Sequence, residues 1–189
     1  MADLREMAWQ RIPEHGDPQD WISGNFQRWE LNTSDLAARR GIDNRFATAD
    51  ELRSAVHLCR EVMQPVREKF GRYSPNSVYR SQALERALKN KPASWISHSQ
   101  HTLGQACDIE VHSATNLRLA RWIAEHLRFD QLILECYSAE AGPYSGWVHV
   151  SLKPPGQGRN RAEVLSYVRD PATGRYVYVN GLVESPPAP

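Results

Sequence analysis

Several features that would point to a particular class of protein are missing from this 189-residue sequence. Its three cysteines, Cys59, Cys107 and Cys136, are odd in number and irregularly spaced, which argues against a disulfide framework and against a zinc site built from thiolates. No apolar run approaches the length of a membrane span. Residues 1–14 are polar and carry both signs of charge, so they do not form a secretory signal. We therefore expect the protein to be made in the cytoplasm and to have no membrane partner.

The sequence also lacks a surplus of charge of either sign. Its formal net charge is +1, so no overall field attracts nucleic acid, and we expect no nucleic-acid partner. Hydrophobic residues make up 41% of the chain and charged residues 24%, as in ordinary globular proteins. This length and composition predict one domain with short appendages, and we expect a monomer.

Apolar periodicity and capping residues predict helices in four places. The clearest helix begins after Thr48, which forms a capping box with Glu51, and ends at Gly71. Six apolar residues recur along it at helical spacing and indicate a buried face: Leu52, Val56, Cys59, Met63, Val66 and Phe70. Shorter helices are expected over 34–40, over 82–88 after Ser81, and after a cap at Ser113 or Thr115.

Short strands are expected between these helices, over 77–80, 105–111, 129–136, 147–152 and 176–179. Helices and strands do not alternate regularly, which favours an α+β domain with a small antiparallel sheet and helices packed on one face. Residues 1–30 are interpreted as an irregular lead-in. Residues 156–189 are interpreted as a C-terminal extension that packs on the domain or trails from it and ends in a proline-rich tail.

The most informative segment is 99–108, Ser-Gln-His-Thr-Leu-Gly-Gln-Ala-Cys-Asp, which places His101 and Asp108 seven residues apart with Gly104 between them for a tight turn. A second histidine, His149, follows in Trp-Val-His-Val-Ser. Two imidazoles and a carboxylate form a suitable zinc set that leaves a fourth position open for water. An open position is typical of catalytic rather than structural zinc.

Strand alternation supports the same grouping. In a strand, successive side chains point to opposite faces. Asp108, His149 and Glu135 would each then lie opposite an apolar row of their own strand, so they can converge on one side of one sheet. The apolar rows are Cys107, Ile109 and Val111; Val148, Val150 and Leu152; and Leu132 and Leu134.

These motifs resemble the zinc D-Ala-D-Ala carboxypeptidase and L-alanyl-D-glutamate endopeptidase family, whose fold is shared with Hedgehog signalling domains. The resemblance rests on Ser-x-His-x-x-Gly-x-Ala-x-Asp and the later Trp-x-His-x-Ser. Gly-Ile-Asp-Asn at 41–44, Gln-Pro-Val-Arg-Glu-Lys-Phe-Gly at 64–71 and Tyr-Arg-Ser at 79–81 are similar to the small phage and prophage branch. The similar region covers roughly 30–155, and we take 31–155 as the zinc peptidase domain.

The resemblance implies roles for individual residues. His101, Asp108 and His149 would hold Zn²⁺, and Arg80 would face the substrate and stabilise charge on the carbonyl oxygen. Many relatives carry a catalytic glutamate three residues before the last histidine, where this chain has Gly146. Leu-Ile-Leu-Glu at 132–135 matches the phage-type strand instead, so Glu135 is assigned as the general base, with Glu140 as its rival.

The resemblance therefore implies a zinc peptidase acting on peptidoglycan stem peptides, at D-Ala-D-Ala or at L-Ala-D-Glu, as a phage or prophage cell-wall-degrading enzyme that reaches the wall after release or delivery. Two alternatives remain open at this point. One is a catalytically silent zinc-containing binding module, suggested by Gly146, and the other is a structural component of a virion.

Overall fold

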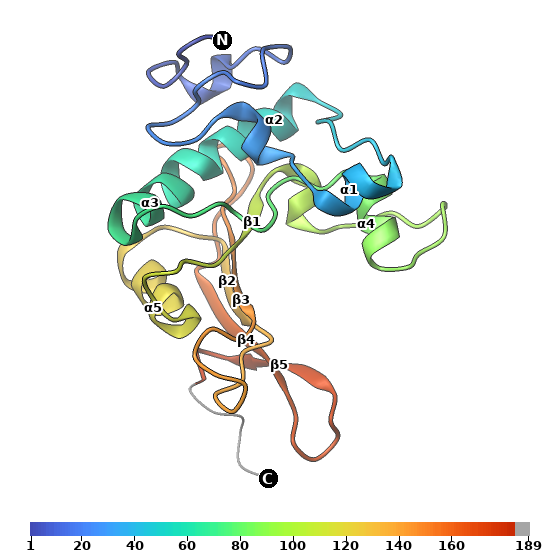
Figure 1. Ribbon diagram of the computed structural model, residues 1–189, viewed down its shortest axis with the longest axis vertical. Coiled ribbons are helices and arrows are strands. Elements are labelled where there is room, and N and C mark those ends of the chain that lie inside the picture. Colours follow the sequence, from blue (N-terminus) through green and yellow to red (C-terminus); the bar gives the residue numbers. More distant parts are fainter. Residues whose placement is uncertain (184–189) are drawn as a thin grey trace.

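A computed structural model of the chain describes residues 1–183; residues 184–189, most of the expected proline-rich tail, lie outside the described residues. Within residues 1–183 it shows one five-stranded sheet in the order β1-β3-β2-β4-β5 (Figure 1). The strands are β1 Ala106–Ile109, β2 Gln131–Glu135, β3 Trp147–Ser151, β4 Glu163–Arg169 and β5 Tyr176–Asn180.

The helices begin and end where the capping residues predict. Thr48 and Glu51 form the expected capping box, Gly41 ends the first helix in a left-handed conformation, and Thr115 rather than Ser113 caps the last helix. The helices are α1 Asp35–Arg40, α2 Ala49–Leu58, α3 Gln64–Phe70, α4 Gln82–Leu88 and α5 Asn116–His126, with 3₁₀ turns η1 Trp9–Arg11, η2 Arg28–Leu31 and η4 Gln100–Leu103.

The predicted long helix over 49–70 is interrupted by a π-helical turn, η3 Cys59–Met63, between α2 and α3. Pro65 stands near the start of α3, where it has no N–H to donate and its ring would clash with a carbonyl of the preceding turn of an ideal α-helix. A wider turn relieves that clash and lets one helix continue through the proline.

The core lies between one face of the sheet and the helices α2, α3 and α5 (Figure 1). The apolar rows of β1, β2 and β3 and the apolar stripe of the long helix meet in a single cluster. The opposite face of these three strands carries Asp108, His149 and Glu135. The α+β class is confirmed, and the fold leaves the polar face of the sheet free to form a site.

Three details of the sheet differ from the prediction. Residues 77–80 do not form a strand: only Ser77 bridges to Asp108, because the Tyr79 and Arg80 amides donate instead to the Leu31 and His101 carbonyls. The strand β4 was not predicted. It pairs in parallel with β2, so the sheet is mixed rather than purely antiparallel.

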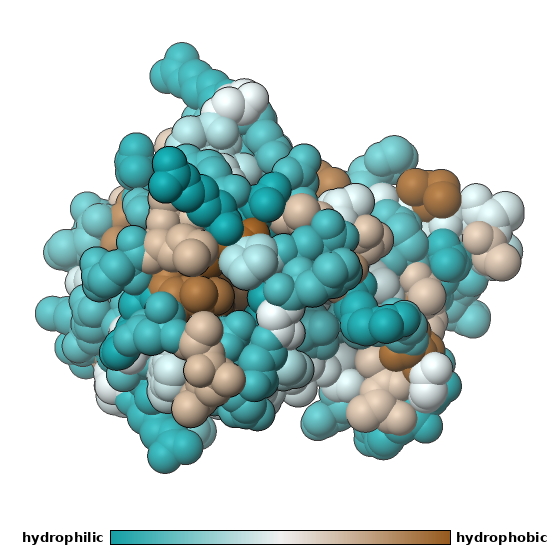
Figure 2. All heavy atoms as spheres, turned by 90° about the horizontal axis from the view of Figure 1, so that it is seen from above, coloured by the Kyte–Doolittle hydropathy of each residue, from teal (hydrophilic) through white to brown (hydrophobic). Residues whose placement is uncertain are grey.

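The first 30 residues wrap the outer side of the long helix and contain only short 3₁₀ turns (Figure 1). Their apolar side chains Ile12, Ile22 and Phe26 are fully buried in the common core. Viewed from this end, the surface is mostly hydrophilic with small hydrophobic patches (Figure 2). Among the described residues, no helix is long and apolar enough to span a membrane.

Asp130, directly before β2, joins the start of β2 to the start of β4. Its buried carboxylate accepts hydrogen bonds from the backbone and side chain of Arg161 at 2.7–3.1 Å and pairs with Lys153 at 3.0 Å. Burial raises the pKa of Asp130, but the hydrogen bonds from Arg161 and the nearby Lys153 outweigh it and lower the pKa from 3.8 to about 2.

Asp130→Asn is expected to lower the free energy of unfolding by about 1–2 kcal/mol at pH 7. Because the folded-state pKa is depressed, this contribution is fully present above pH 4 and is lost as the pH falls through about 2. Urea unfolding of the metal-free wild type and variant at pH 7 and at pH 2–3 measures it. A stability difference that did not shrink at low pH would contradict the ionic origin of the effect.

Candidate metal centre

Three side chains from two adjacent strands and one turn meet on the polar face of the sheet. Asp108 on β1 and His149 on β3 are directly opposite each other in the antiparallel pair. His101 lies in η4, which Gly104 ends in a left-handed conformation before β1 begins. A Cβ at Gly104 would lie 2.1 Å from the Glu51 carbonyl oxygen of α2, so only glycine lets this turn pack against the helix.

The distances among these three side chains fit a small tetrahedral metal. His101 Nε2 lies 3.3 Å from His149 Nδ1 and 3.3 Å from Asp108 Oδ1, and His149 Nδ1 lies 3.0 Å from Asp108 Oδ1. Ligands at about 2.0–2.1 Å from a tetrahedral zinc are separated by about 3.3–3.4 Å. The three donor atoms therefore form one face of a tetrahedron of the size that zinc requires.

The protonation states also suit a metal. The Nδ1 atom of His101 lies 2.7 Å from the Val78 carbonyl oxygen, so it carries the proton and leaves Nε2 as a free lone pair. Burial lowers the pKa of His101, which favours the neutral ring. Burial raises the pKa of Asp108, but the two histidines outweigh it and hold that pKa well below its usual range. Neutral imidazole and ionised carboxylate are the forms that bind metals.

Glu135 stands beside this triad. It lines the same cleft, of about 800 Å³, as the three ligand candidates, and its strand partner Trp147 lies two residues before His149. Burial raises the pKa of Glu135, and Asp108 raises it further against the opposing effect of His149. Glu140, by contrast, is exposed in the loop between β2 and β3 and does not line the cleft.

Comparison with known protein families gives one match: the family described as Peptidase M15 matches residues 24–151, about two thirds of the chain. The chain belongs to the Peptidase M15 family. Members of this family are metal-dependent peptidases of the D-Ala-D-Ala carboxypeptidase type, and the matched segment contains the whole triad. Comparisons with curated proteins and with solved structures gave no match.

In this M15 chain, backbone geometry explains why the position three residues before His149 is glycine. Gly146 has φ 67°, and a Cβ there would lie only 1.9 Å from the Glu135 carbonyl oxygen. The hairpin between β2 and β3 closes so tightly at its base that no side chain fits. A glutamate at this position is therefore excluded by the fold of this chain.

Gly146→Ala is expected to destabilise the protein by at least about 2 kcal/mol, because it adds a backbone clash to the strain of positive φ. Gly142→Ala is the matched control: its φ is also positive, at 107°, but a Cβ there meets nothing within 4 Å, so we expect about 1 kcal/mol. Chemical denaturation of both variants measures the difference. Equal losses of unfolding free energy in the two variants would show that the close approach of residue 146 to the Glu135 carbonyl does not contribute to the destabilisation.

Arg80 also lies in the cleft, and all three parts of its guanidinium are engaged. Nε donates to Ser77 Oγ at 2.7 Å, Nη1 to Glu85 Oε1 at 3.0 Å, and Nη2 to Asp108 Oδ2. The arginine therefore links a candidate metal ligand to the buried carboxylate of Glu85. Burial raises the pKa of Glu85, but the hydrogen bonds from Lys89 and Arg80 outweigh it and leave the pKa below its usual value.

Sequence reasoning missed Glu85. The signal that could have found it is the spacing of Glu85 and Lys89, one helical turn apart, on a helix that begins directly after the Tyr-Arg-Ser segment. The carboxylate also accepts from Ser97 Oγ at 3.0 Å, so it ties α4, Arg80 and the loop over 89–99 together.

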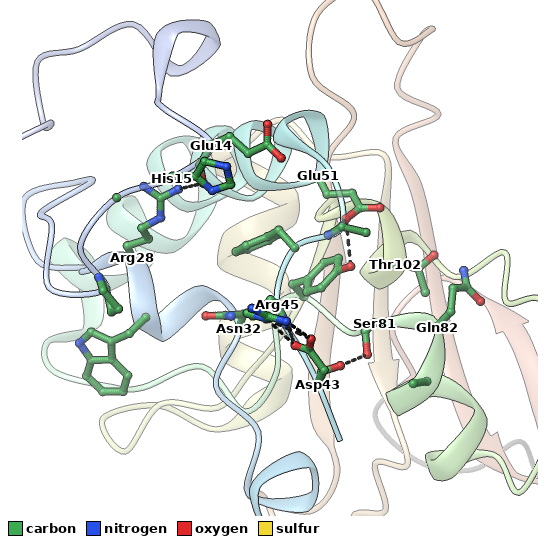
Figure 3. A pocket seen from close by; sticks show the side chains of 17 residues that line it. Glu14, His15, Arg28, Asn32, Asp43, Arg45, Glu51, Ser81, Gln82 and Thr102 are labelled. Atoms are coloured by element: carbon green, nitrogen blue, oxygen red, sulfur yellow. Dashed lines mark hydrogen bonds and ion pairs between the residues drawn. The ribbon is translucent and has the colours of Figure 1, made fainter. Parts of the chain in front are cut away.

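A second cleft, of about 680 Å³, is lined by residues of the lead-in, by Asp43 and residues 45–47, and by Tyr79 and residues 81–83 on either side of Arg80 (Figure 3). Its residues brace that segment: Ser81 Oγ donates to the Asp43 carbonyl at 2.8 Å, and Tyr79 Oη donates to Glu51 at 2.9 Å. Buried Asn44 completes the brace, because its side chain bonds both the Tyr79 carbonyl and the Ser81 amide. The segment 41–44, one of those that resemble the peptidase family, therefore helps to position Arg80.

Proposed function

We propose that this protein is a zinc-dependent peptidase that hydrolyses peptidoglycan stem peptides, at D-Ala-D-Ala or L-Ala-D-Glu, and that it serves as a phage or prophage cell-wall-degrading enzyme acting after release or delivery to the wall. The single observation that carries the proposal is the tetrahedral face formed by His101, Asp108 and His149 with Glu135 beside it in one cleft. The substrate and the phage role rest on the resemblance of the motifs to the small phage branch.

Each side chain then has a defined task. A zinc ion, when bound, supplies Lewis acidity that polarises the scissile carbonyl and acidifies water. Glu135 accepts a proton from the attacking water and returns it to the leaving amine, so that one peptide bond is replaced by a carboxylate and an amine. A partly buried carboxyl with a raised pKa suits both transfers. Arg80 donates to the carbonyl oxygen as negative charge develops on it.

The proposal is tested by the metal content of the purified protein together with digestion of purified peptidoglycan. We expect about one zinc per chain, new amino ends in the digest, and loss of cleavage with a chelator followed by recovery with zinc. The residue that carries each new amino end identifies the bond. A protein that binds no metal under any loading condition would overturn the assignment of the three ligands.

A catalytically silent binding module of the same fold is the second candidate, and Gly146 is the observation that favours it. Many relatives place their catalytic glutamate at this position, and here it has no side chain. The two candidates differ in digestion: zinc bound without any new amino end, in wild type and in the Glu135→Gln variant alike, identifies the module.

Arg80→Lys is expected to lower kcat by about 10²-fold while bound zinc stays near one per chain. Lysine keeps a positive charge beside Glu85, so the fold survives, but it cannot hold three partners with a planar fork. Arg86→Lys on α4, the helix that carries Glu85, is the control. If the variant instead bound zinc 10- to 100-fold more weakly and kept kcat at saturating zinc, Arg80 would be a positioning residue for Asp108.

A further inference from the structure

The strands β4 and β5 lie beyond the segment that matches the Peptidase M15 family, yet they extend the face of the sheet that carries the metal centre. Trp147 on β3 is opposite Glu135 on β2, Glu135 is opposite Tyr167 on β4, and Tyr167 is opposite Tyr178 on β5. Residues directly opposite each other in a sheet project to the same face. One row of side chains therefore runs from the candidate base to the outer edge of the sheet.

Three tyrosines at the end of this row, Tyr167, Tyr176 and Tyr178, form what we call the tyrosine platform. The ring of Tyr167 lies 4.5 Å from that of Tyr178 and 5.2 Å from that of Tyr176, centroid to centroid, with interplanar angles of 34° and 28°. The outer two remain open to solvent, with exposed fractions of 46% for Tyr176 and 59% for Tyr178. Stacked rings held by a sheet but left uncovered are preorganised for a flat ligand.

The platform is continuous with the catalytic cleft. Tyr178 lines the same cleft as His149 and Glu135. Neighbouring strands are about 4.8 Å apart, so Tyr178 on β5 lies about 10 Å from Glu135, two strands away. An extended peptide advances about 3.3 Å per residue, so the platform meets a group two or three residue lengths from the reacting bond.

The chemistry of that group follows from the platform. The two exposed phenol rings of the platform offer apolar surface with hydroxyl rims, which matches a pyranose ring that has a C–H face and polar edges. Stem peptides carry no aromatic side chain, but their amino end is joined through a lactyl arm to a sugar of the glycan strand. When the L-Ala-D-Glu bond lies at Glu135, the sugar is at about this distance from it. When the D-Ala-D-Ala bond lies at Glu135, the sugar is several residues farther away.

Resting on the proposed function, we propose that the tyrosine platform binds a sugar ring of the glycan strand and makes the enzyme prefer stem peptides that are still attached to glycan. The preference acts through β5, which is outside the family segment, and it favours cleavage at the bond nearest the sugar.

The test compares kcat/KM for a disaccharide-linked stem peptide with kcat/KM for the same peptide without sugar. We expect Tyr178→Ala to reduce the ratio of the two values about 3- to 10-fold, and Tyr178→Phe, which keeps the ring, to restore it. Tyr144→Ala is the control, since Tyr144 is similarly exposed, at 58%, but lies outside the platform. An unchanged ratio in Tyr178→Ala, or a loss that Tyr178→Phe does not restore, overturns the proposal.

Failure of the proposed function gives a different result. If the wild type cleaves neither substrate, the peptidase assignment fails, and the platform is then tested by calorimetric binding of the peptide-free disaccharide. Binding that Tyr178→Ala weakens and Tyr178→Phe keeps supports the platform on its own, and binding that is absent or equal in all variants overturns it.

Discussion

Asp108→Ala is expected to lose its bound zinc and its peptidase activity together, with kcat/KM falling on the order of 10³-fold or more. Asp108 supplies the only carboxylate of the three-residue metal cluster found in residues 1–183, and its Oδ1 lies 3.0–3.3 Å from both histidine nitrogens. Removing it leaves two neutral ligands, which cannot balance the charge of the ion. Zinc content by elemental measurement and hydrolysis of purified peptidoglycan are the two readouts.

Two further variants separate metal loss from misfolding. Asp108→Asn keeps the shape of the side chain and an oxygen that can accept from Arg80, and the bridge of Asp108 to Ser77 is made by the backbone, so the variant should fold and bind zinc more weakly than the wild type. Glu110→Ala, two residues farther along, removes an exposed carboxylate outside the metal cleft and should leave zinc and activity unchanged. Full zinc occupancy in a folded Asp108→Ala protein would remove Asp108 from the ligand set.

The shared face of Asp108, His149 and Glu135 was predictable from sequence because these three residues lie on strands with strict alternation. Asp108, His149 and Glu135 each alternate with the apolar residues of their own strand, and a period of two places them on the face opposite the core whatever the exact ends of the strands. The helix caps at Thr48, Ser81 and Thr115 were local in the same sense: each side-chain oxygen accepts a hydrogen bond from a backbone N–H three residues away.

What could not be predicted depends on partners distant in sequence. Tyr79 and Arg80 lie in a segment whose residue types favour a strand. Their backbone N–H groups instead donate hydrogen bonds to the carbonyls of Leu31 and His101. The strand β4 alternates buried Ser166 and Val168 with Tyr167, but its pairing partner β2 is about 30 residues away in sequence, and the contact of Asp130 with Arg161 beside it forms only in the folded chain. The Glu85–Arg80–Asp108 link likewise exists only once α4, the segment over 77–80 and β1 have come together.

Glu135→Gln is expected to lower kcat by about 10²- to 10⁴-fold and to leave zinc at one per chain, because the amide cannot accept the proton of the attacking water. Glutamine matches the size of glutamate, and Glu135 is not among the three ligand candidates, so neither the fold nor the metal set depends on its charge. Steady-state hydrolysis at saturating substrate and zinc analysis of the same sample measure both parts.

Glu140→Gln is the matched control and also the test of the rival base. Glu140 is exposed in the 136–146 loop and outside the cleft, so the same chemical change there should leave kcat within about twofold. The opposite pattern, with Glu140→Gln inactive and Glu135→Gln active, would mean that the loop closes over the substrate and brings Glu140 to the bond. Because Gly146 fixes the base of that hairpin against the Glu135 carbonyl, such a closure would have to bend the loop beyond residue 138, and the full effect is therefore expected at Glu135.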